Sequence, residues 1–184
     1  MTKVAIRPAG ASDVPDIARI HADSWRRHYR GMYSDHYLDG DLYSDRLAAW
    51  TEKLNKDARG YFTLLAELEG YPVGFAHVSL DGDPRWGALA DNLHVSHCAQ
   101  GSGIGSLLLD HVARRVIEQR PGSGIHLWVL ELNDAATAFY VSRKGVLTDR
   151  ELSSPPGKDP RNLHGSPRRI RVVWEDPRAL VISQ

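Results

Sequence analysis

Apolar residues recur every three or four positions in three segments of the chain, which is the spacing of an amphipathic helix. The residues on these apolar faces are Val14, Ile17, Ala18, His21 and Trp25; Leu47, Trp50 and Leu54; and Ile104, Leu108, Val112 and Val116. Ser12 and Asp13 are both good N-cap residues. We therefore expect one helix that begins near residue 13 and ends around Gly31, and further helices over residues 42–54 and 104–119.

Shorter apolar and β-branched runs between these helices predict strands. The expected strands cover residues 3–7, 61–67, 73–80, 88–95, 125–132, 146–152 and 169–174. Glu69-Gly70 is a turn that joins two of them into a hairpin, and residues 81–84 (Asp-Gly-Asp-Pro) break the chain after it. Asn133 is expected to cap a helix over residues 134–143, and residues 153–167 to form the longest loop.

The order of these elements predicts the class of fold. Helices come first, followed by an antiparallel hairpin, a strand–helix–strand–helix unit and hairpin-like strands. This order is typical of an α+β domain with a mixed, mostly antiparallel sheet. The length of 184 residues predicts a single domain, residues 1–184.

Composition narrows the classes of partner. The chain has 23 basic and 23 acidic residues, so its formal net charge of zero predicts no general attraction to nucleic acid or to an anionic membrane. It has no apolar run long enough to span a bilayer. Arg7 and Pro8 interrupt the N-terminus before a signal peptide could form, and Cys98 is a single cysteine. We expect a cytoplasmic protein.

The segment Gln-Gly-Ser-Gly-Ile-Gly at residues 100–105 is the strongest chemical signal in the chain. A short apolar run, residues 93–95, precedes it and a predicted helix follows at once. The first N–H groups of a helix lack intrahelical partners and carry partial positive charge, so they bind phosphate. Glycines allow the backbone to come close to such a ligand. The segment therefore predicts a phosphate-bearing cofactor.

Two other glycine-rich motifs fit less well. Gly101, Gly103 and Ser106 nearly match the dinucleotide-binding pattern G-x-G-x-x-G/A, but the hairpin before them replaces the strand–helix alternation of that fold. That fold also needs an acidic residue at the end of the next strand. The nearest candidate here, Glu131, lies too far along the chain. A P-loop requires Gly-Lys-Ser/Thr after the glycines, and the chain has none.

The same residues resemble the GNAT superfamily of N-acetyltransferases. Residues 100–105 match its Arg/Gln-x-x-Gly-x-Gly/Ala signature, and Leu93-x-Val95 precedes them at the usual distance. A second motif of the superfamily is matched downstream by Asn133, Ala136, Phe139, Tyr140 and Gly145. The two motifs together cover residues 90–145. The resemblance implies a sheet with helices on both faces and acetyl-CoA as the cosubstrate.

The resemblance also places the cosubstrate. Its pyrophosphate would lie on the backbone N–H groups of residues 101–106, and its pantetheine arm beside strand 88–95, which splays away from the parallel strand 125–132. The cofactor-binding residues implied in this way are Leu93, Val95, Gln100, Gly101, Ser102, Gly103, Ile104, Gly105, Ser106 and Asn133. On a purely structural interpretation, the glycines would serve close packing and Asn133 would serve only as a helix cap.

Acetyl transfer to an amine needs a group that protonates the departing thiolate and a group that takes a proton from the ammonium. By resemblance, Tyr140 is the general acid; the alternative is a core aromatic. The sequence offers several candidates for the base. Asp91 is the first candidate, on the same strand face as Leu89, whereas regular alternation turns His94 the other way. Glu131 and bulk water through a relay remain alternatives. No metal cluster and no covalent acyl-enzyme are expected.

The acceptor is expected to meet Trp25, Tyr29 and Tyr33 at the end of the first helix, although these residues also suit a scaffold role. It would be an amine of a small molecule or a protein. The acidic residues Asp35, Asp39, Asp41 and Asp45 could attract a cationic amine but are more typical of a solvated face. The basic residues Arg161, His164, Arg168, Arg169 and Arg171 could contact the 3′-phosphate of CoA or the substrate, and lack the aromatic residues of a nucleic-acid site.

Two function classes remain open on the sequence. The first is an acetyl-CoA-dependent N-acetyltransferase that works by direct attack of the amine. The second is a non-catalytic acyl-CoA-binding or regulatory domain of the same fold. Pairing of exposed strands into a homodimer is common in the superfamily, and this sequence gives no signal for it.

Overall fold

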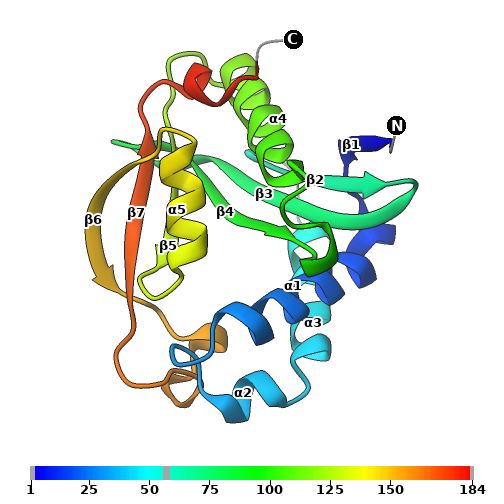
Figure 1. Cartoon of the computed structure of the whole chain (residues 1–184), viewed down its shortest axis with the longest axis vertical. Helices are drawn as coiled ribbons and strands as arrows, with labels where there is room; N and C mark the ends of the chain where they lie inside the picture. Colours follow the sequence, from blue (N-terminus) through cyan, green and yellow to red (C-terminus); the bar gives the residue numbers. More distant parts are fainter. Residues whose placement is uncertain (1–2, 56–58, 183–184) are drawn as a thin grey trace.

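A computed structural model describes residues 3–55 and 59–182 (Figure 1). The helices of eight or more residues are α1 (Val14–His28), α3 (Leu42–Asn55), α4 (Ile104–Gln119) and α5 (Asp134–Ser142). The strands are β1 (Val4–Pro8), β2 (Tyr61–Leu68), β3 (Tyr71–Asp83), β4 (Gly87–Val95), β5 (Ile125–Leu130), β6 (Val146–Leu152) and β7 (Arg168–Trp174). These elements agree with the predicted ones to within a few residues.

Two differences from the sequence prediction have simple causes. A short helix, α2 (Asp35–Asp39), was not predicted; the Ser34 side chain caps it by accepting a hydrogen bond from the Tyr37 N–H. Strand β3 continues to Asp83, beyond the predicted break, because Asp83 still pairs with Gly87 of β4 across a register shift. The turn therefore lies at residues 84–86.

The described strands form one sheet in the order β1-β2-β3-β4-β5-β7-β6. Every neighbouring pair in that order is antiparallel except β4 and β5, which are parallel. The fold is therefore α+β with a mixed, mostly antiparallel sheet, as predicted.

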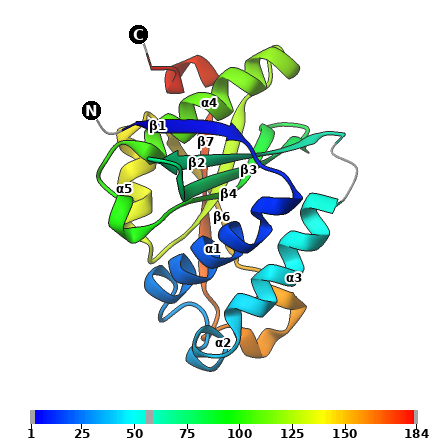
Figure 2. The same cartoon turned by 90° about the vertical axis from the view of Figure 1, so that its right-hand side faces the viewer.

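Helices cover both faces of this sheet (Figure 2). On one face, α4 and α5 pack on the largest core cluster, which includes Leu108 and Val112 of α4 together with Val78, Leu127 and Val172 of the sheet. On the other face, α1 and α3 contribute Ile17 and Trp50, which pack on Leu65 and Phe75. The apolar stripes read from the sequence are the faces that these helices bury.

Strand β4 carries a one-residue bulge at Asp91. Ala90 pairs with Val78 and Asn92 pairs with His77, so no residue of β3 lies opposite Asp91. A bulge of this kind changes the side-chain alternation beyond it. Residues 92–95 therefore face the opposite way from regular alternation, which matters for the site described below.

The segment between β6 and β7 packs against the connection between α1 and α2 (Figure 1). The Ser34 N–H donates to the Asn162 carbonyl at 2.9 Å, and the His164 N–H donates to the Met32 carbonyl at 2.9 Å. Two short 3-10 turns, Pro156–Lys158 and Pro160–Asn162, lie within it. The long late loop thus closes one end of the molecule beside α2.

Within the described part of the chain, every helix is too short or too polar to cross a membrane.

Candidate active site

A cleft opens where β4 and β5 separate. In the described residues their pairing is confined to Ala88 with Ile125 and Leu89 with His126; beyond these pairs the strands diverge. The cavity that results has a volume of about 510 Å³. The predicted pair of splayed parallel strands is therefore confirmed.

The glycine loop forms one end of this cavity. Gly101 and Gly103 have φ values of 77° and 84°, a left-handed conformation that is costly for other residues. Gly103 is the N-cap of α4, and this helix, described in full, has no acidic residue in its first turn. The orphan N–H groups and partial positive charge at its start are therefore not neutralised by the chain itself. The site suits an anion.

Two side chains fix the loop. Gln100 Nε2 donates to the Val95 carbonyl oxygen at 3.1 Å, and Ser102 Oγ donates to the Ala99 carbonyl oxygen at 2.5 Å. Gly105 has a packing role as well: a Cβ there would lie 3.2 Å from Cζ of Phe139 on α5. The packing interpretation of the glycines therefore holds for Gly105, whereas Gly103 is required by its backbone conformation.

Most of the predicted cofactor residues line the cavity. They are Leu93, Val95, Gln100, Gly101, Gly103, Ile104, Gly105, Ser106 and Asn133. Ser102 does not line it and instead supports the loop through Ala99. Asn133 lines the cavity and is also a helix cap. Its Oδ1 caps α5 by accepting from the Ala136 N–H at 3.2 Å.

Tyr140 lies deep in the same cavity. Its side chain is 8% exposed and its ring packs edge-on against Phe139 and Trp174. Among the described residues, the Tyr140 hydroxyl has no hydrogen-bond partner. Burial raises the pKa of Tyr140 well above its usual value, so the phenol keeps its proton at neutral pH.

Asp91 lines the cavity from the bulge in β4, with Lys53 of α3 beside it. Lys53 Nζ lies 2.5 Å from Asp91 Oδ2, and Asn92 Nδ2 donates to the same oxygen at 2.8 Å. Burial is the largest single influence on the pKa of Asp91 and works to raise it. The charge and hydrogen bond of Lys53, together with smaller effects of His77 and Asn92, outweigh burial, and the pKa is lowered overall. Asp91 is therefore ionised at neutral pH. Nothing in the sequence pattern pointed to Lys53.

The sequence prediction for His94 was wrong. Regular alternation turned it away from Asp91, but the bulge at Asp91 brings both side chains to the same cavity. His94 Nδ1 lies 2.9 Å from Ser24 Oγ of α1. Burial lowers the pKa of His94 to about 3, so the imidazole is neutral.

A second cavity of about 260 Å³ adjoins the first. The two share Tyr29, Asp91, Asn92, His94 and Trp128. All three predicted acceptor residues line this second cavity, and they lie in contact as a cluster: the Trp25 and Tyr33 rings are 5.1 Å apart, as are those of Tyr29 and Tyr33. The second cavity is the candidate acceptor cavity.

Several weaker candidates lie elsewhere. Glu131 lines neither cavity and lies 3.4 Å from Arg150. The acidic residues of the α1–α3 region also line neither cavity: Asp35 and Asp39 pair with Arg30, Asp45 pairs with Arg46, and Asp41 accepts from the Ser44 N–H. They act in local structure.

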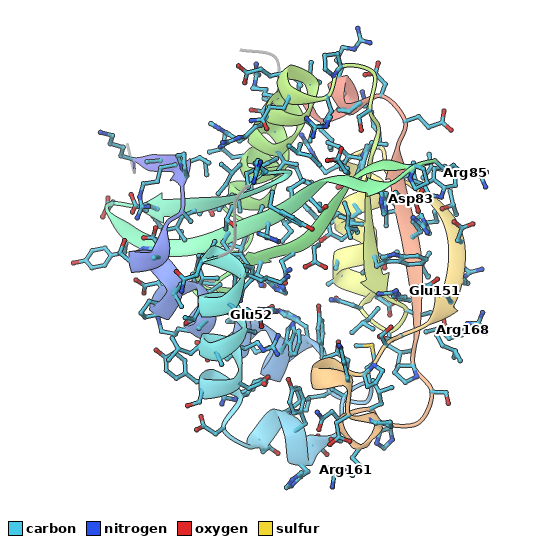
Figure 3. The ribbon with its side chains drawn as sticks, turned by 180° about the vertical axis from the view of Figure 1, so that it is seen from behind. Glu52, Asp83, Arg85, Glu151, Arg161 and Arg168 are labelled. Atoms are coloured by element: carbon cyan, nitrogen blue, oxygen red, sulfur yellow. The ribbon has the colours of Figure 1, made fainter. Side chains whose placement is uncertain are left out.

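The late basic residues do not form one patch. Figure 3 shows Arg161 beside α2 and Arg168 at the outer edge formed by β6 and β7. Arg161 pairs with Asp159, and Arg171 pairs with Asp149. Arg169 is the member of this group that lines a described cavity, namely the acceptor cavity.

The buried histidines predict that acid weakens the fold. Burial lowers the pKa of His77 to about 4 and that of His94 to about 3, so the unfolded chain binds protons that the folded chain excludes. Their contribution to stability is complete above pH 6.5 and is lost as the pH falls toward 4, at about 1.4 kcal/mol per pH unit for each imidazole.

Urea unfolding between pH 7 and pH 4.5 measures this dependence of the free energy of unfolding on pH. His77→Gln should reduce the slope and His36→Gln, at an exposed site, should leave it unchanged; equal slopes in all three proteins would contradict the assignment.

This chain is similar to known proteins in both sequence and structure. A curated protein of Mycobacterium tuberculosis, named "Probable N-acetyltransferase Rv2775", is 28% identical over 158 residues, which cover 84% of this chain and 87% of that protein. A solved structure of a GCN5-related N-acetyltransferase from Rhodopseudomonas palustris is 25% identical, with a TM-score of 0.69 and coverage of 94% of this chain and 96% of the other.

A further solved structure, the PaiA N-acetyltransferase of Thermoplasma acidophilum in complex with coenzyme A, is similar in fold. Its TM-score is 0.67 at 16% identity, with coverage of 94% of this chain and 99% of that one. The sequence model of the acetyltransferase (GNAT) family matches residues 17–145, which include the glycine loop, the cleft and Tyr140. The chain therefore belongs to the acetyltransferase (GNAT) family.

Proposed function

We propose that this protein transfers the acetyl group of acetyl-CoA to the primary amine of a small molecule by direct attack. Family membership makes acetyl-CoA the cosubstrate and the protein an acetyltransferase. The observation that carries the finer proposal is the junction of two cavities at Asp91. One cavity ends in the glycine loop, and the other is lined by aromatic residues. An amine in the second would therefore reach an acetyl group held in the first.

The chain offers a consistent set of groups for the cosubstrate. The N–H groups of Gly103, Ile104 and Gly105 at the start of α4 would hold the pyrophosphate. Strand β4 leaves the backbone of Leu93 and Val95 beside the cleft for the pantetheine arm. When bound, acetyl-CoA supplies an activated thioester.

Tyr140 is the proposed general acid. Its phenol lies in the cleft, keeps its proton because burial raises its pKa, and has no competing partner among the described residues. A general acid must hold its proton until sulfur leaves, and a phenol can do this at neutral pH. This role also accounts for a hydroxyl, on a side chain that lines the cleft, that makes no hydrogen bond with the described residues.

Asp91 is the proposed acceptor of the amine proton. It is ionised, so it attracts an ammonium group, and its position at the junction places it beside both cavities. Its lowered pKa makes it a weak base, so the proton is passed on to solvent. The Asp91 side chain is 42% exposed, which gives water access to it.

Replacement of Asp91 by asparagine is expected to lower kcat/KM at pH 7 by about 10-fold. This loss is smaller than the range usual for a general base, because solvent can replace a weak base. Steady-state kinetics across pH measures it, with Asp81→Asn, an exposed surface carboxylate, as the control. Unchanged activity of Asp91→Asn would remove Asp91 from the mechanism and favour a water relay alone.

The proposed function is tested first by thermal unfolding with acetyl-CoA, CoA, NAD and ATP at equal concentration, followed by an amine screen. A ligand at 100 times its Kd adds about 2.7 kcal/mol to the free energy of unfolding. We expect a shift with acetyl-CoA and CoA only, and turnover of an amine. A shift with CoA but no turnover of any amine would instead support a non-catalytic acyl-CoA-binding domain, and a shift with NAD alone would contradict both functions.

A further inference from the structure

The acceptor cavity is lined by flat aromatic rings. Five line it, from α1, α3, β5 and the segment after α1: Trp25, Tyr29, Tyr33, Trp50 and Trp128. Aromatic walls of this kind favour a ligand with an apolar or aromatic body. The volume of about 260 Å³ is small for a ligand pocket, which favours a small molecule.

The charged side chains that line this cavity are mainly basic. Among its described lining residues the cavity has Arg46, Lys53 and Arg169, against one carboxylate, Asp91. The lining histidines add no charge at neutral pH, since burial lowers the pKa values of both. Asp45 and Glu151 pair with Arg46 and Arg169 from outside this lining, so the cavity is marked by cationic hydrogen-bond donors on its wall and not by an excess of positive charge.

Arg46 keeps part of its guanidinium free. Nε and Nη2 donate to Asp45 at 3.1 and 2.7 Å, and the group stacks 4.3 Å from the centre of the Trp25 ring. Nη1 has no hydrogen-bond partner among the described residues. The Arg46 side chain is only 12% exposed, so that donor is held in place rather than freely solvated.

Arg169, on β7, repeats this arrangement. Its Nε donates to Glu151 at 2.8 Å, its Nη2 contacts the same carboxylate, and the guanidinium stacks 4.6 Å from the centre of the Trp128 ring. Again Nη1 has no partner within the described part of the chain. Burial is the main reason that the pKa of Tyr33 is raised, to about 12, while the charges of both Arg46 and Arg169 oppose that rise. Both cations therefore act on the same part of the cavity.

His21 adds an independent donor. The Trp50 Nε1–H donates to His21 Nδ1 at 2.9 Å, so the neutral imidazole must carry its proton on Nε2. That Nε2–H is buried and has no hydrogen-bond partner among the described residues, and the His21 side chain is 3% exposed. A buried donor without a partner is costly, and a ligand oxygen would satisfy it.

We infer that the acceptor is a small primary amine that also carries an anionic oxygen group, such as a carboxylate, on an apolar or aromatic body. Its amine faces Asp91 at the junction with the cofactor cleft. Its anionic group faces the free donors of Arg46, Arg169 and His21. This inference rests on the proposed function and adds the class of substrate to it.

The experiment compares matched amines that differ by one carboxylate. The pairs are tryptophan and tryptamine, phenylalanine and phenethylamine, and 4-(aminomethyl)benzoate and benzylamine; spermidine serves as a purely cationic acceptor. The amine and carboxylate are attached to the same carbon in tryptophan and phenylalanine but lie at opposite ends of the ring in 4-(aminomethyl)benzoate, so the set also reports the spacing of the site. We expect kcat/KM to be at least about 10-fold higher for the carboxylate in one pair or more, because a charge-assisted hydrogen bond is lost without it.

Arg169→Gln connects that preference to the cavity. It should lower kcat/KM for the preferred carboxylate by about 10-fold or more, mostly through KM, and lower it far less for the uncharged partner. Arg169→Lys keeps the charge but not the fork of donors, so it should restore part of the loss. Arg168→Gln is the matched control, since Arg168 is the exposed neighbour at the outer edge of the sheet and lines neither cavity (Figure 3).

The outcomes separate this inference from the function on which it rests. Equal or better turnover of the uncharged amines or of spermidine would overturn the inference and leave the acetyltransferase intact. An equal loss for both members of a pair in Arg169→Gln would also overturn it, since that indicates displaced Trp128 rather than a lost anion contact. Binding of CoA without acetylation of any amine in the set would contradict the proposed function, and the inference with it.

Discussion

Replacement of Tyr140 by phenylalanine is expected to lower kcat by about 100-fold at saturating acetyl-CoA and amine, because it removes the proton donor for the departing sulfur. The KM for acetyl-CoA should change little, since the ring and its contacts with Phe139 and Trp174 remain. The midpoint of thermal unfolding should be unchanged or slightly higher. The Tyr140 hydroxyl has no hydrogen-bond partner among the described residues, so its removal breaks no hydrogen bond in that part of the folded chain.

This combination distinguishes catalysis from packing. A core aromatic that only fills space would give no loss of kcat on removal of one oxygen atom. Tyr71→Phe, at a 75% exposed position, controls for the general effect of the substitution. Retention of full kcat by Tyr140→Phe, with chemistry shown to be rate-limiting by the dependence of kcat on pH, would assign the acid role to solvent instead.

Replacement of Ser106 by glutamate is expected to weaken CoA binding by about 100-fold while it stabilises the protein without ligand. Ser106 lies in the first turn of α4, two residues after Ile104, and lines the cofactor cleft. A negative charge there interacts favourably with the start of the helix, by about 0.3–1 kcal/mol. The same charge competes with the pyrophosphate for the N–H groups and repels it, at a cost of a few kcal/mol in a partly buried site.

Ser106→Gln is the matched control, because it has the shape of glutamate without the charge. Calorimetric titration with CoA and thermal unfolding without ligand give the two quantities. We expect Ser106→Glu to bind CoA more weakly and to unfold at a higher temperature without ligand. Ser106→Gln should show only a small loss of affinity for CoA. Equal affinity in the two variants would show that the phosphates bind elsewhere.

Much of the fold could be predicted because its signals are local. The stripe Ile104, Leu108 and Val112 follows helical spacing, and the helix begins and ends as predicted. Asn133 caps α5 through its own side chain, and the turn at Glu69-Gly70 lies between two strands as expected. Helix periodicity, capping and turns depend on neighbours within a few residues, so they can be read along the chain.

The glycine loop could also be predicted, for a related reason. A phosphate site at a helix start needs only a short run of residues with the right backbone freedom. Gly101 and Gly103 adopt the left-handed conformation that this requires. Family resemblance then added Tyr140 and the separation of strands 88–95 and 125–132, which no spacing rule alone provides.

The candidate acceptor cavity could be predicted only in part: Trp25, Tyr29 and Tyr33 were expected there, but its other walls come from segments far apart in the sequence. Lys53 reaches Asp91 across 38 positions, and Trp50 donates to His21 across 29. His94 was assigned to the wrong face because the bulge at Asp91 depends on how β4 pairs with β3, and single-strand periodicity contains no information on pairing.

The sequence by itself determined the order of the elements, the faces that the helices bury and the glycine-rich start of α4 that makes it the candidate anion site, because each of these depends on local spacing and backbone preference. Only the tertiary structure decided which side chains meet at Asp91, which tautomer His21 adopts and which arginines keep donors free. Those properties arise from long-range packing. A polar group that such packing buries must find a hydrogen-bond partner or shift its pKa.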